Sequence, residues 1–331
     1  LEYFTEGIIM KKGFIVLLVV LAVAGTVFAQ GSQEAYPTKP IDLVLASSPG
    51  SGGDVTSRLI AKHLGQELGV TVNIINTPGG SGIPAVQSVL TAPADGYTLM
   101  SEQGLSSSYQ MALDEIPYDI FKDRKYICKI ASGPQVLCGS PNMGWNDIRD
   151  VAAFIKANPG KEFFWGGIGI SSAANFAVIQ FMNSCGVDIT KTKEVRYDGG
   201  GKILAAIAGG HIMIGSCAAS GVPPFVQDGS VKPLVVSGSS RLATLPDVPC
   251  AAELGLTELT ADFWIGISGS KNIPDSVVKT IEAAAEKISK DPAFIADLAK
   301  VGVVVNFVGS ADMPAALEKE GTAVRKMVKG N

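Results

Sequence analysis

Residues that carry catalysis or bind metals are scarce in this chain of 331 residues, which has only two histidines. His63 falls inside an expected helix, and His211 follows two glycines at a turn, so we predict structural and surface roles for them. The five cysteines have spacings that match no metal-binding pattern. With no paired-carboxylate motif either, the sequence argues against a metal centre, and it predicts a protein that is not an enzyme and uses no cofactor.

Charge is scarce as well. Charged residues make up 18% of the chain, the formal net charge is −4, and no stripe of lysines and arginines is visible. A nucleic acid is therefore excluded as a main partner, because its phosphates would need such a stripe. The cysteines are odd in number and lie in or beside apolar runs, which favours buried thiols over a disulfide framework.

The common nucleotide-binding motifs are incomplete. Lys202 follows three glycines as in a P-loop, but Ile203 stands where serine or threonine is required. The dinucleotide-binding pattern begins at Gly167 and Gly169, but Ser172 replaces its last glycine. Neither motif supports a nucleotide as the ligand.

A hydrolase motif is only partly present. Ser48 lies in a small-residue turn after an apolar run, as in a nucleophile elbow, but Ala46 replaces the first glycine and Pro49 follows directly. No histidine is placed to act as its base. An exported esterase that uses Ser48 is therefore the weakest of the functions that we carry forward.

The N-terminal residues have the pattern of an export signal. Met10 to Lys12 is a positively charged start, residues 14–24 are apolar, and small residues precede a cleavage point after Ala29. The apolar run is shorter than the roughly 18 residues of a membrane span. We interpret residues 1–9 as upstream of this signal peptide and predict a mature, exported, periplasmic protein that starts at residue 30.

A glycine-rich loop between an expected strand, residues 41–46, and an expected helix is the most informative stretch. The helix has apolar residues with a 3.6-residue period, and Asp54 is expected to be its N-cap. Glycines leave the backbone amides open, and a helix N-terminus adds partial positive charge. The loop thus predicts a backbone-built anion cradle, formed by Ser48, Pro49, Gly50, Ser51, Gly52, Gly53 and Asp54.

Three further loops of this kind follow short apolar strands. They begin near residues 76, 166 and 198, and the polar loop 101–108 is expected to reach the same cleft. Alternating strands and helices predict an α/β fold, whose ligand sites lie beyond the carboxyl ends of the strands. The chain is longer than a single hydrophobic core usually supports, and the four loops fall into two pairs along the sequence. We therefore predict two lobes that face each other across a cleft.

Nine short motifs, in this order, resemble the Bordetella uptake gene (Bug) family, the solute-binding proteins of tripartite tricarboxylate transporters. They are Tyr36-Pro37-x-Lys39-Pro40-Ile41, Pro49-Gly50-x-Gly52-x-Asp54, Asn76-x-Pro78-Gly79, Ala94-Asp95-Gly96-Tyr97-Thr98-Leu99, Pro117-Tyr118-Asp119, Ala157-Asn158-Pro159-Gly160-Lys161, Tyr197-x-Gly199-Gly200-Gly201, Gly209-Gly210-His211 and Leu245-Pro246-Asp247-Val248-Pro249. The resemblance covers residues 36–328.

The resemblance implies a two-lobe fold of the type II periplasmic-binding-protein kind, each lobe a sheet flanked by helices. Residues 36–136 and 264–331 would form the first lobe and residues 137–263 the second, with crossings near 135–140 and 263–268. The ligand would be a small carboxylate, often a di- or tricarboxylate. Beside the first cradle, the implied ligand-binding residues are Gly79, Gly80, Ser81, Gly82, Ser171, Ser172, Asn175, Tyr197 and Gly200.

The implied partner is a membrane permease with a large and a small subunit. A protein that closes around a solute and docks on a permease needs no oligomer, so we expect a monomer. A ligand-sensing partner of a membrane receptor is the alternative, because it would use the same cleft. Departures from the family pattern at Ser47, Ser51, Gly53, Ser81 and Met213 alter the cleft polarity, so no particular ligand is implied.

Overall fold

The computed structural model describes residues 36–169 and 172–329, and its main compact unit runs from residue 39 onward. The expected signal peptide and Ser171 lie outside the described residues. No helix in the described part of the chain is long and apolar enough to cross a membrane.

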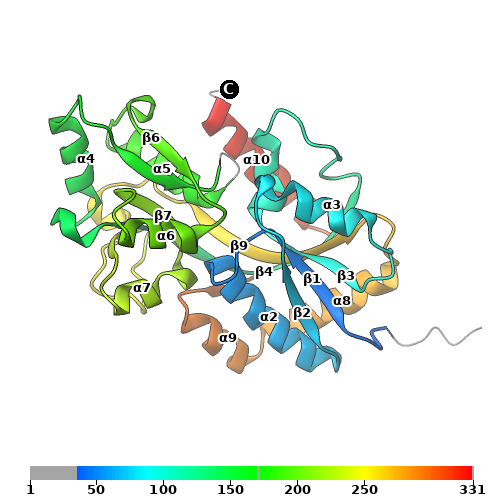
Figure 1. Cartoon of the computed structure of the whole chain (residues 1–331). Coiled ribbons are helices and arrows are strands. Elements are labelled where there is room, and N and C mark those ends of the chain that lie inside the picture. Colours follow the sequence, from blue (N-terminus) through cyan, green and yellow to red (C-terminus); the bar gives the residue numbers. More distant parts are fainter. Residues whose placement is uncertain (1–35, 170–171, 330–331) are drawn as a thin grey trace, which may run out of the picture. The chain divides into compact units, whose positions relative to one another are not determined.

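Strands and helices alternate along most of this unit, which confirms the α/β prediction (Figure 1). The strands are β1 Ile41–Leu45, β2 Val72–Asn76, β3 Thr98–Glu102, β4 Arg124–Gly139, β5 Phe164–Gly167, β6 Lys193–Arg196, β7 Ile214–Ala218, β8 Lys232–Val236, β9 Asp262–Ser270 and β10 Val304–Gly309. The helices are α2 Gly52–Leu68, α3 Ile83–Thr91, α4 Ile148–Ala157, α5 Ala173–Ser184, α6 Gly200–Ala208, α7 Pro223–Gln227, α8 Asp275–Ser289, α9 Pro292–Ala299 and α10 Met313–Lys329.

The described strands form one hydrogen-bonded sheet in the order β2-β1-β3-β9-β4-β7-β5-β6, with β8 and β10 also paired to β4. Pairs β1–β2, β1–β3, β5–β6 and β5–β7 are parallel, and the pairs made by β4 and β9 are antiparallel. The parallel strands therefore bring their following loops to common edges, as the sequence predicts.

Strand β4 joins two groups of strands. Its residues 124–134 pair with β9, and residues 135–139 pair with β7. We call β1, β2, β3, β9, β10 and residues 124–134 the first half-sheet, and β5, β6, β7, β8 and residues 135–139 the second half-sheet. In Figure 1 the green helices α4 to α7 gather at the second half-sheet, and the blue and cyan elements lie at the first.

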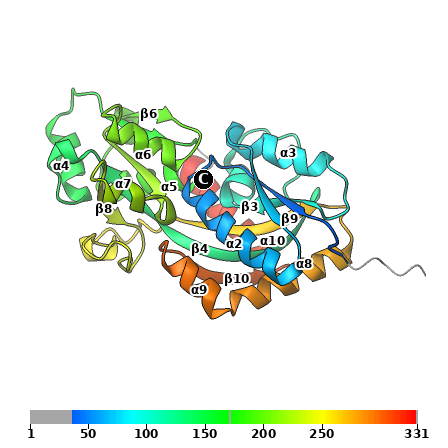
Figure 2. The same cartoon turned by 60° about the horizontal axis from the view of Figure 1, so that its bottom comes forward.

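The sequence predicts two apolar runs separated at Ser132-Gly133-Pro134, but the structure has one strand of 16 residues there. Gly133 fits because an added Cβ would lie 2.9 Å from the ring of Phe263, so no side chain could be accommodated. Pro134 continues the register opposite Asp262. Figure 2 shows β10 and α9 below this strand, and β10 and α8 contact it.

Other local features follow from the residue types. Helix α4 begins after Asp147, whose side chain accepts a hydrogen bond from Arg149 N as an N-cap. His63 is buried and its Nε2 lies 3.1 Å from Asp297 Oδ2, which fits the structural role predicted for it. All five cysteines are free, and four of them are buried.

Candidate ligand-binding cavity

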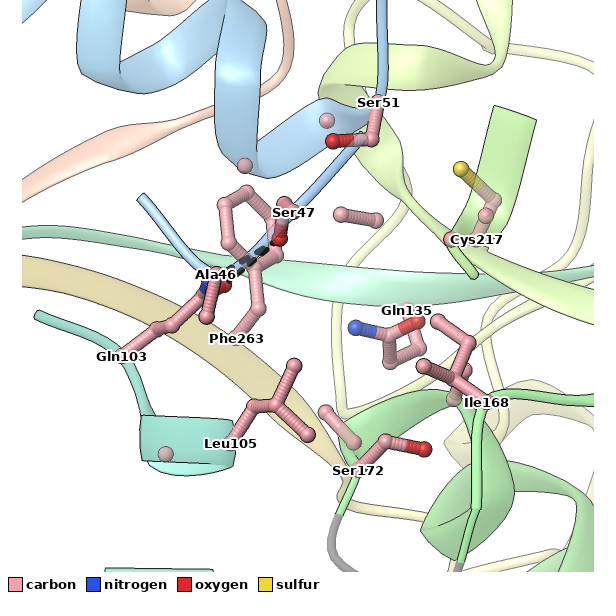
Figure 3. Close-up of a pocket in the computed structure, with 18 of the residues that line it drawn as sticks. Ala46, Ser47, Ser51, Gln103, Leu105, Gln135, Ile168, Ser172, Cys217 and Phe263 are labelled. Atoms are coloured by element: carbon pink, nitrogen blue, oxygen red, sulfur yellow. Dashed lines mark hydrogen bonds between the residues drawn. The ribbon is translucent and has the colours of Figure 1, made fainter. Parts of the chain in front are cut away.

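A cavity of about 70 Å³ lies among the loops that follow β1, β3, β5 and β6 and the carboxyl end of β7 (Figure 3). A cavity of this size suits a small ligand. The residues that line it are Ala46, Ser47, Ser51, Gly52, Gly53, Gln103, Gly104, Leu105, Tyr109, Gln135, Ile168, Ser172, Ala173, Ala174, Asp198, Gly199, Gly200, Cys217, Ala218, Phe263 and Trp264.

Helix α2 begins at the cavity wall, and its N-cap is Ser51 rather than the predicted Asp54. Ser51 has an extended backbone, and its Oγ accepts a hydrogen bond from Asp54 N at 3.3 Å. The prediction was wrong because Gly52 and Gly53, which look like loop residues, form the first turn of the helix.

Asp54 instead holds the loop in place by hydrogen bonds to Gly50 and to neighbouring side chains. Its buried carboxylate accepts hydrogen bonds from Gly50 N at 2.9 Å, Arg58 Nε at 3.0 Å and Asn76 Nδ2 at 2.9 Å. Burial raises the pKa of Asp54, but the hydrogen bonds from Arg58, Gly50 and Asn76 outweigh it and hold the pKa below its ordinary value. The carboxylate therefore stays charged, and protein donors occupy its oxygens.

The loop before α2 packs directly against the second half-sheet. A Cβ on Gly52 would lie 2.5 Å from Ala218 Cβ, and Ser220 Oγ donates a hydrogen bond to Gly52 O at 2.8 Å. Ser48 Oγ donates to Asp198 O at 2.8 Å in the same way. These contacts close the cavity between the two half-sheets. They also occupy the Ser48 hydroxyl, so nothing in the described site favours a nucleophilic role for it.

Helix α5 begins at the opposite wall with Ser172 as its N-cap. Ser172 Oγ accepts from Asn175 N at 3.2 Å. Asn175 Oδ1 in turn accepts from Ile168 N at 2.7 Å and Gly169 N at 3.2 Å, and its Nδ2 donates to Glu194 at 2.9 Å. Asn175 therefore shapes the loop, whereas Ser172 reaches the cavity.

Helix α6 contributes a third N-terminus at Gly200, preceded by Gly199. A Cβ on Gly200 would lie 2.6 Å from Cys217 Sγ, so this approach requires glycine. Burial raises the pKa of the Cys217 thiol to about 12, which keeps it neutral. Cys217 thus acts as a small apolar wall against which the helix terminus rests.

Backbone N–H groups of these three helices are available at the cavity. Those of Gly53, Ala174 and Gly200 have no hydrogen-bond acceptor among residues 36–169 and 172–329. The first N–H groups of a helix lack intrahelical partners, and the helix dipole adds partial positive charge there. Three such termini around one small volume have the chemistry that an anion requires, without a cationic side chain.

The described lining residues include no lysine, arginine or histidine. Asp198 is the only carboxylate among them, and it is exposed, with its Oδ2 2.6 Å from Lys202 Nζ. The attraction for an anion must therefore come from backbone and neutral side-chain donors. This agrees with the backbone-built cradle that the sequence predicts.

A buried ion pair supports the loop that carries Gln103. Glu102 and Arg124 are both buried and in direct contact, and Arg124 also donates to Ser106 O at 2.6 Å and to Ser268 Oγ at 3.0 Å. Burial lowers the pKa of Arg124, but Glu102, Tyr126 and Tyr118 together outweigh burial and raise the pKa above its ordinary value. With this support, Gln103 Nε2 donates to Ser47 Oγ at 2.9 Å beside the cavity.

An aromatic wall closes the remaining side. Tyr109 packs 5.2 Å from the Phe176 ring, and burial raises its pKa well above the ordinary value. Trp264 Nε1 donates to both carboxylate oxygens of Glu320 at 3.1 Å. The wall therefore offers apolar surface to the ligand and keeps its polar atoms turned to protein partners.

The structure brings five of the predicted residues to the cavity wall, namely Ser51, Gly52, Gly53, Ser172 and Gly200. The other described residues of the predicted set do not line it, and they are Ser48, Pro49, Gly50, Asp54, Gly79, Gly80, Ser81, Gly82, Asn175 and Tyr197. Ser81 lies next to it in the fold, where its carbonyl accepts from Gln110 Nε2 at 2.8 Å.

Sequence reasoning missed the side chains that complete the wall. Gln103 belongs to the polar loop expected at the cleft, but nothing local singles it out. Gln135 is a polar residue at the start of an apolar run, which is the one signal that could have indicated a role for it. Tyr109, Phe263 and Trp264 read as ordinary core residues, because only the tertiary fold exposes them to the cavity.

A family model described as "Tripartite tricarboxylate transporter family receptor" matches residues 56–328. The chain belongs to this family. Two relatives come from Bordetella pertussis. One is a UPF0065 protein, 28% identical with 82% of each chain covered, and the other is Protein BugT, 26% identical with 88% of this chain and 89% of BugT covered. The resemblance to the Bug family drawn from nine motifs is thereby confirmed.

Solved structures have the same fold. The R. palustris protein Rpa4515 with adipate has a TM-score of 0.82 at 24% identity, covering 89% of this chain and 97% of that one. MatC from Rhodopseudomonas palustris with bound malate has a TM-score of 0.80 at 22% identity, covering 88% and 100%. The periplasmic binding protein BugD has a TM-score of 0.80 at 21% identity, covering 89% and 98%. The predicted periplasmic-binding-protein-like fold is therefore confirmed.

Proposed function

We propose that this family member is an extracytoplasmic solute-binding protein that holds a small organic acid in the cavity between its half-sheets. The observation that carries the proposal is the convergence of three helix N-termini, at Gly52, Ala173 and Gly200, on a cavity with no cation in its described lining. Such a site favours an anion small enough to accept several backbone N–H groups, and a carboxylate meets that requirement.

The relatives support the ligand class. Structures of similar fold were solved with adipate and with malate, which are both small dicarboxylates. The family description further supports delivery of the acid to a tripartite transporter, whose permease has a large and a small subunit. From the family description we also propose that the protein is exported to the periplasm, is monomeric and has no catalytic activity.

The predicted lobes fit this role. We propose that residues 36–136 with 264–331 and residues 137–263 move against each other about β4 and β9 when the acid enters or leaves. The hydrogen bonds from Ser48 to Asp198 and from Ser220 to Gly52 would then form on closing. A hinge between lobes is a common arrangement in binding proteins.

Thermal unfolding of residues 30–331 with succinate, malate, adipate, citrate, amino acids and sugars tests the proposal. A ligand that binds only the folded state raises the apparent Tm by mass action, so we expect a rise with one class of carboxylate. Mass spectrometry under native conditions checks beforehand for acid retained from expression. The proposal is overturned if only sugars raise the Tm. It is also overturned if no carboxylate raises the Tm after retained ligand has been removed.

A Gly200→Val variant ties the ligand to this cavity. Its side chain would collide with Cys217 and fill the N-terminus of α6, so acid affinity should fall by more than about tenfold. Gly160→Val is the matched control, because a Cβ at Gly160 meets no atom within 4 Å. Equal affinities of the two variants in calorimetric titrations would place the acid elsewhere.

A further inference from the structure

Gln135 lies where β4 passes from the first half-sheet to the second, and its backbone is fully engaged. Its N–H donates to Ser237 Oγ at 2.9 Å, and its carbonyl accepts from Ser237 N at 2.9 Å. It pairs with Ala218 of β7, directly after Pro134 has paired with β9. The backbone therefore holds the side chain at a fixed point on the cavity floor.

The side chain of Gln135 is only partly satisfied. The residue is 2% exposed, and its Oε1 accepts from Ser216 Oγ at 3.0 Å. Its Nε2 has no acceptor within residues 36–169 and 172–329, and Figure 3 shows this nitrogen directed into the cavity. A primary amide carries two N–H donors, and a donor that is open to the cavity can be paired only by what enters the cavity. The nitrogen is thus an unused donor that faces the ligand space.

This donor is independent of the helix N-termini. The termini of α2, α5 and α6 supply backbone N–H groups from the loops, whereas Gln135 supplies a side-chain amide from the sheet. Leu105 and Phe263 also line the cavity, and their apolar surface can pack against the carbon atoms of a ligand (Figure 3). The cavity therefore offers two kinds of polar contact together with an apolar wall.

We propose that Gln135 Nε2 donates to a second oxygen of the bound acid, distinct from the carboxylate held at the helix N-termini. This inference rests on the proposed function and adds a residue that sets its specificity. An acid with a second oxygen acceptor should bind more tightly than an alkyl acid of equal chain length. A site built to hydrogen-bond a polar group rejects the analogue that lacks it, because the donor is then left unpaired.

Calorimetric titration with acids of matched chain length tests the inference. The probes are succinate and butyrate, glutarate and pentanoate, and adipate and hexanoate. For the wild-type mature protein we expect the diacid of at least one pair to bind about ten- to hundred-fold more tightly than its alkyl partner, the range for a hydrogen bond to a charged group. Gln135→Met should reduce this ratio to less than about threefold by weakening the diacid alone.

Two further variants complete the experiment. Gln87→Met, on the exposed face of α3, is the control and should keep the wild-type ratio. Gln135→Glu can still accept from Ser216 but replaces the donor with an acceptor, so it should weaken the diacid more than the alkyl acid even where the methionine variant folds poorly. An unchanged ratio in a folded Gln135 variant overturns this inference alone. Failure of the wild-type protein to bind any of the six acids overturns the proposed function and this inference together.

Discussion

Two carboxylates, the buried Glu102 and the partly buried Glu320, stand behind the cavity wall, and the molecule compensates them in different ways. Glu102 contacts the Arg124 guanidinium and accepts from the hydroxyls of Ser106 and Ser268. Glu320, on α10, is held only by neutral donors, the indole of Trp264 and the hydroxyl of Ser108, and it makes no ion pair within the described residues.

The difference is visible in how burial acts on each group. Burial raises the pKa of Glu320, and the hydrogen bonds from Ser108 and Trp264 offset only part of that rise. Glu102 is paired with Arg124, which carries a full positive charge. Removal of either side chain therefore leaves the charge of the other without a partner. The comparison teaches that the Gln103 loop depends on a charge pair, whereas the aromatic wall depends on neutral hydrogen bonds.

Removal of the Arg124 charge should have the largest effect. Arg124→Met leaves Glu102 buried without a cation, so the free energy of unfolding should fall by about 3–5 kcal/mol in urea titrations. Lys122→Met, at a side chain that is 85% exposed, should change it by less than about 0.5 kcal/mol. The Arg124→Met variant should regain stability when Glu102→Leu is added, because the uncompensated charge is then gone. A loss below about 1 kcal/mol in the single variant would contradict the comparison.

Substitution of one serine beside each carboxylate should have the next largest effect. Ser268→Ala removes a hydroxyl that donates to Glu102 and accepts from Arg124, so it should cost about 1.5–3 kcal/mol of unfolding free energy. Ser108→Ala removes one of the neutral donors to Glu320 and should cost about 0.5–1.5 kcal/mol. Both are measured by urea unfolding at pH 7. The reverse order would show that the charge pair is not the stronger constraint.

The smallest expected effect is a pH dependence from Glu320. Its folded-state pKa lies above the ordinary value of 4.5, so its contribution to stability is fully present at lower pH and is lost as pH rises through the folded-state pKa. Glu320→Gln cannot ionise, so its stability relative to wild type should increase as pH rises above about 4.5. Thermal unfolding from pH 4 to 8 measures this difference. Glu318→Gln, exposed on the same helix, is the control, and an identical slope for both variants would contradict the assignment.

Local patterns in the sequence determined much of the fold. Apolar periodicity and glycine-rich loops predicted the strand–loop–helix units that end in α2, α5 and α6, because these features depend on near neighbours in the chain. The same patterns predicted a backbone-built anion site, and five of its residues line the cavity. The boundary of α2 was missed by three residues, since glycines can serve either a loop or a first helical turn.

Only the tertiary structure decided what the rest of the cavity is made of. The continuity of β4 through Gly133 and Pro134 depends on strands that lie more than a hundred residues further along the chain. Gln135 faces the ligand space only because β4 changes partners at that residue. The sequence thus determined where the glycine-rich loops and the helix starts lie, through local backbone preferences. The fold decided which side chains face the cavity, because their placement depends on contacts between distant segments that no local pattern encodes.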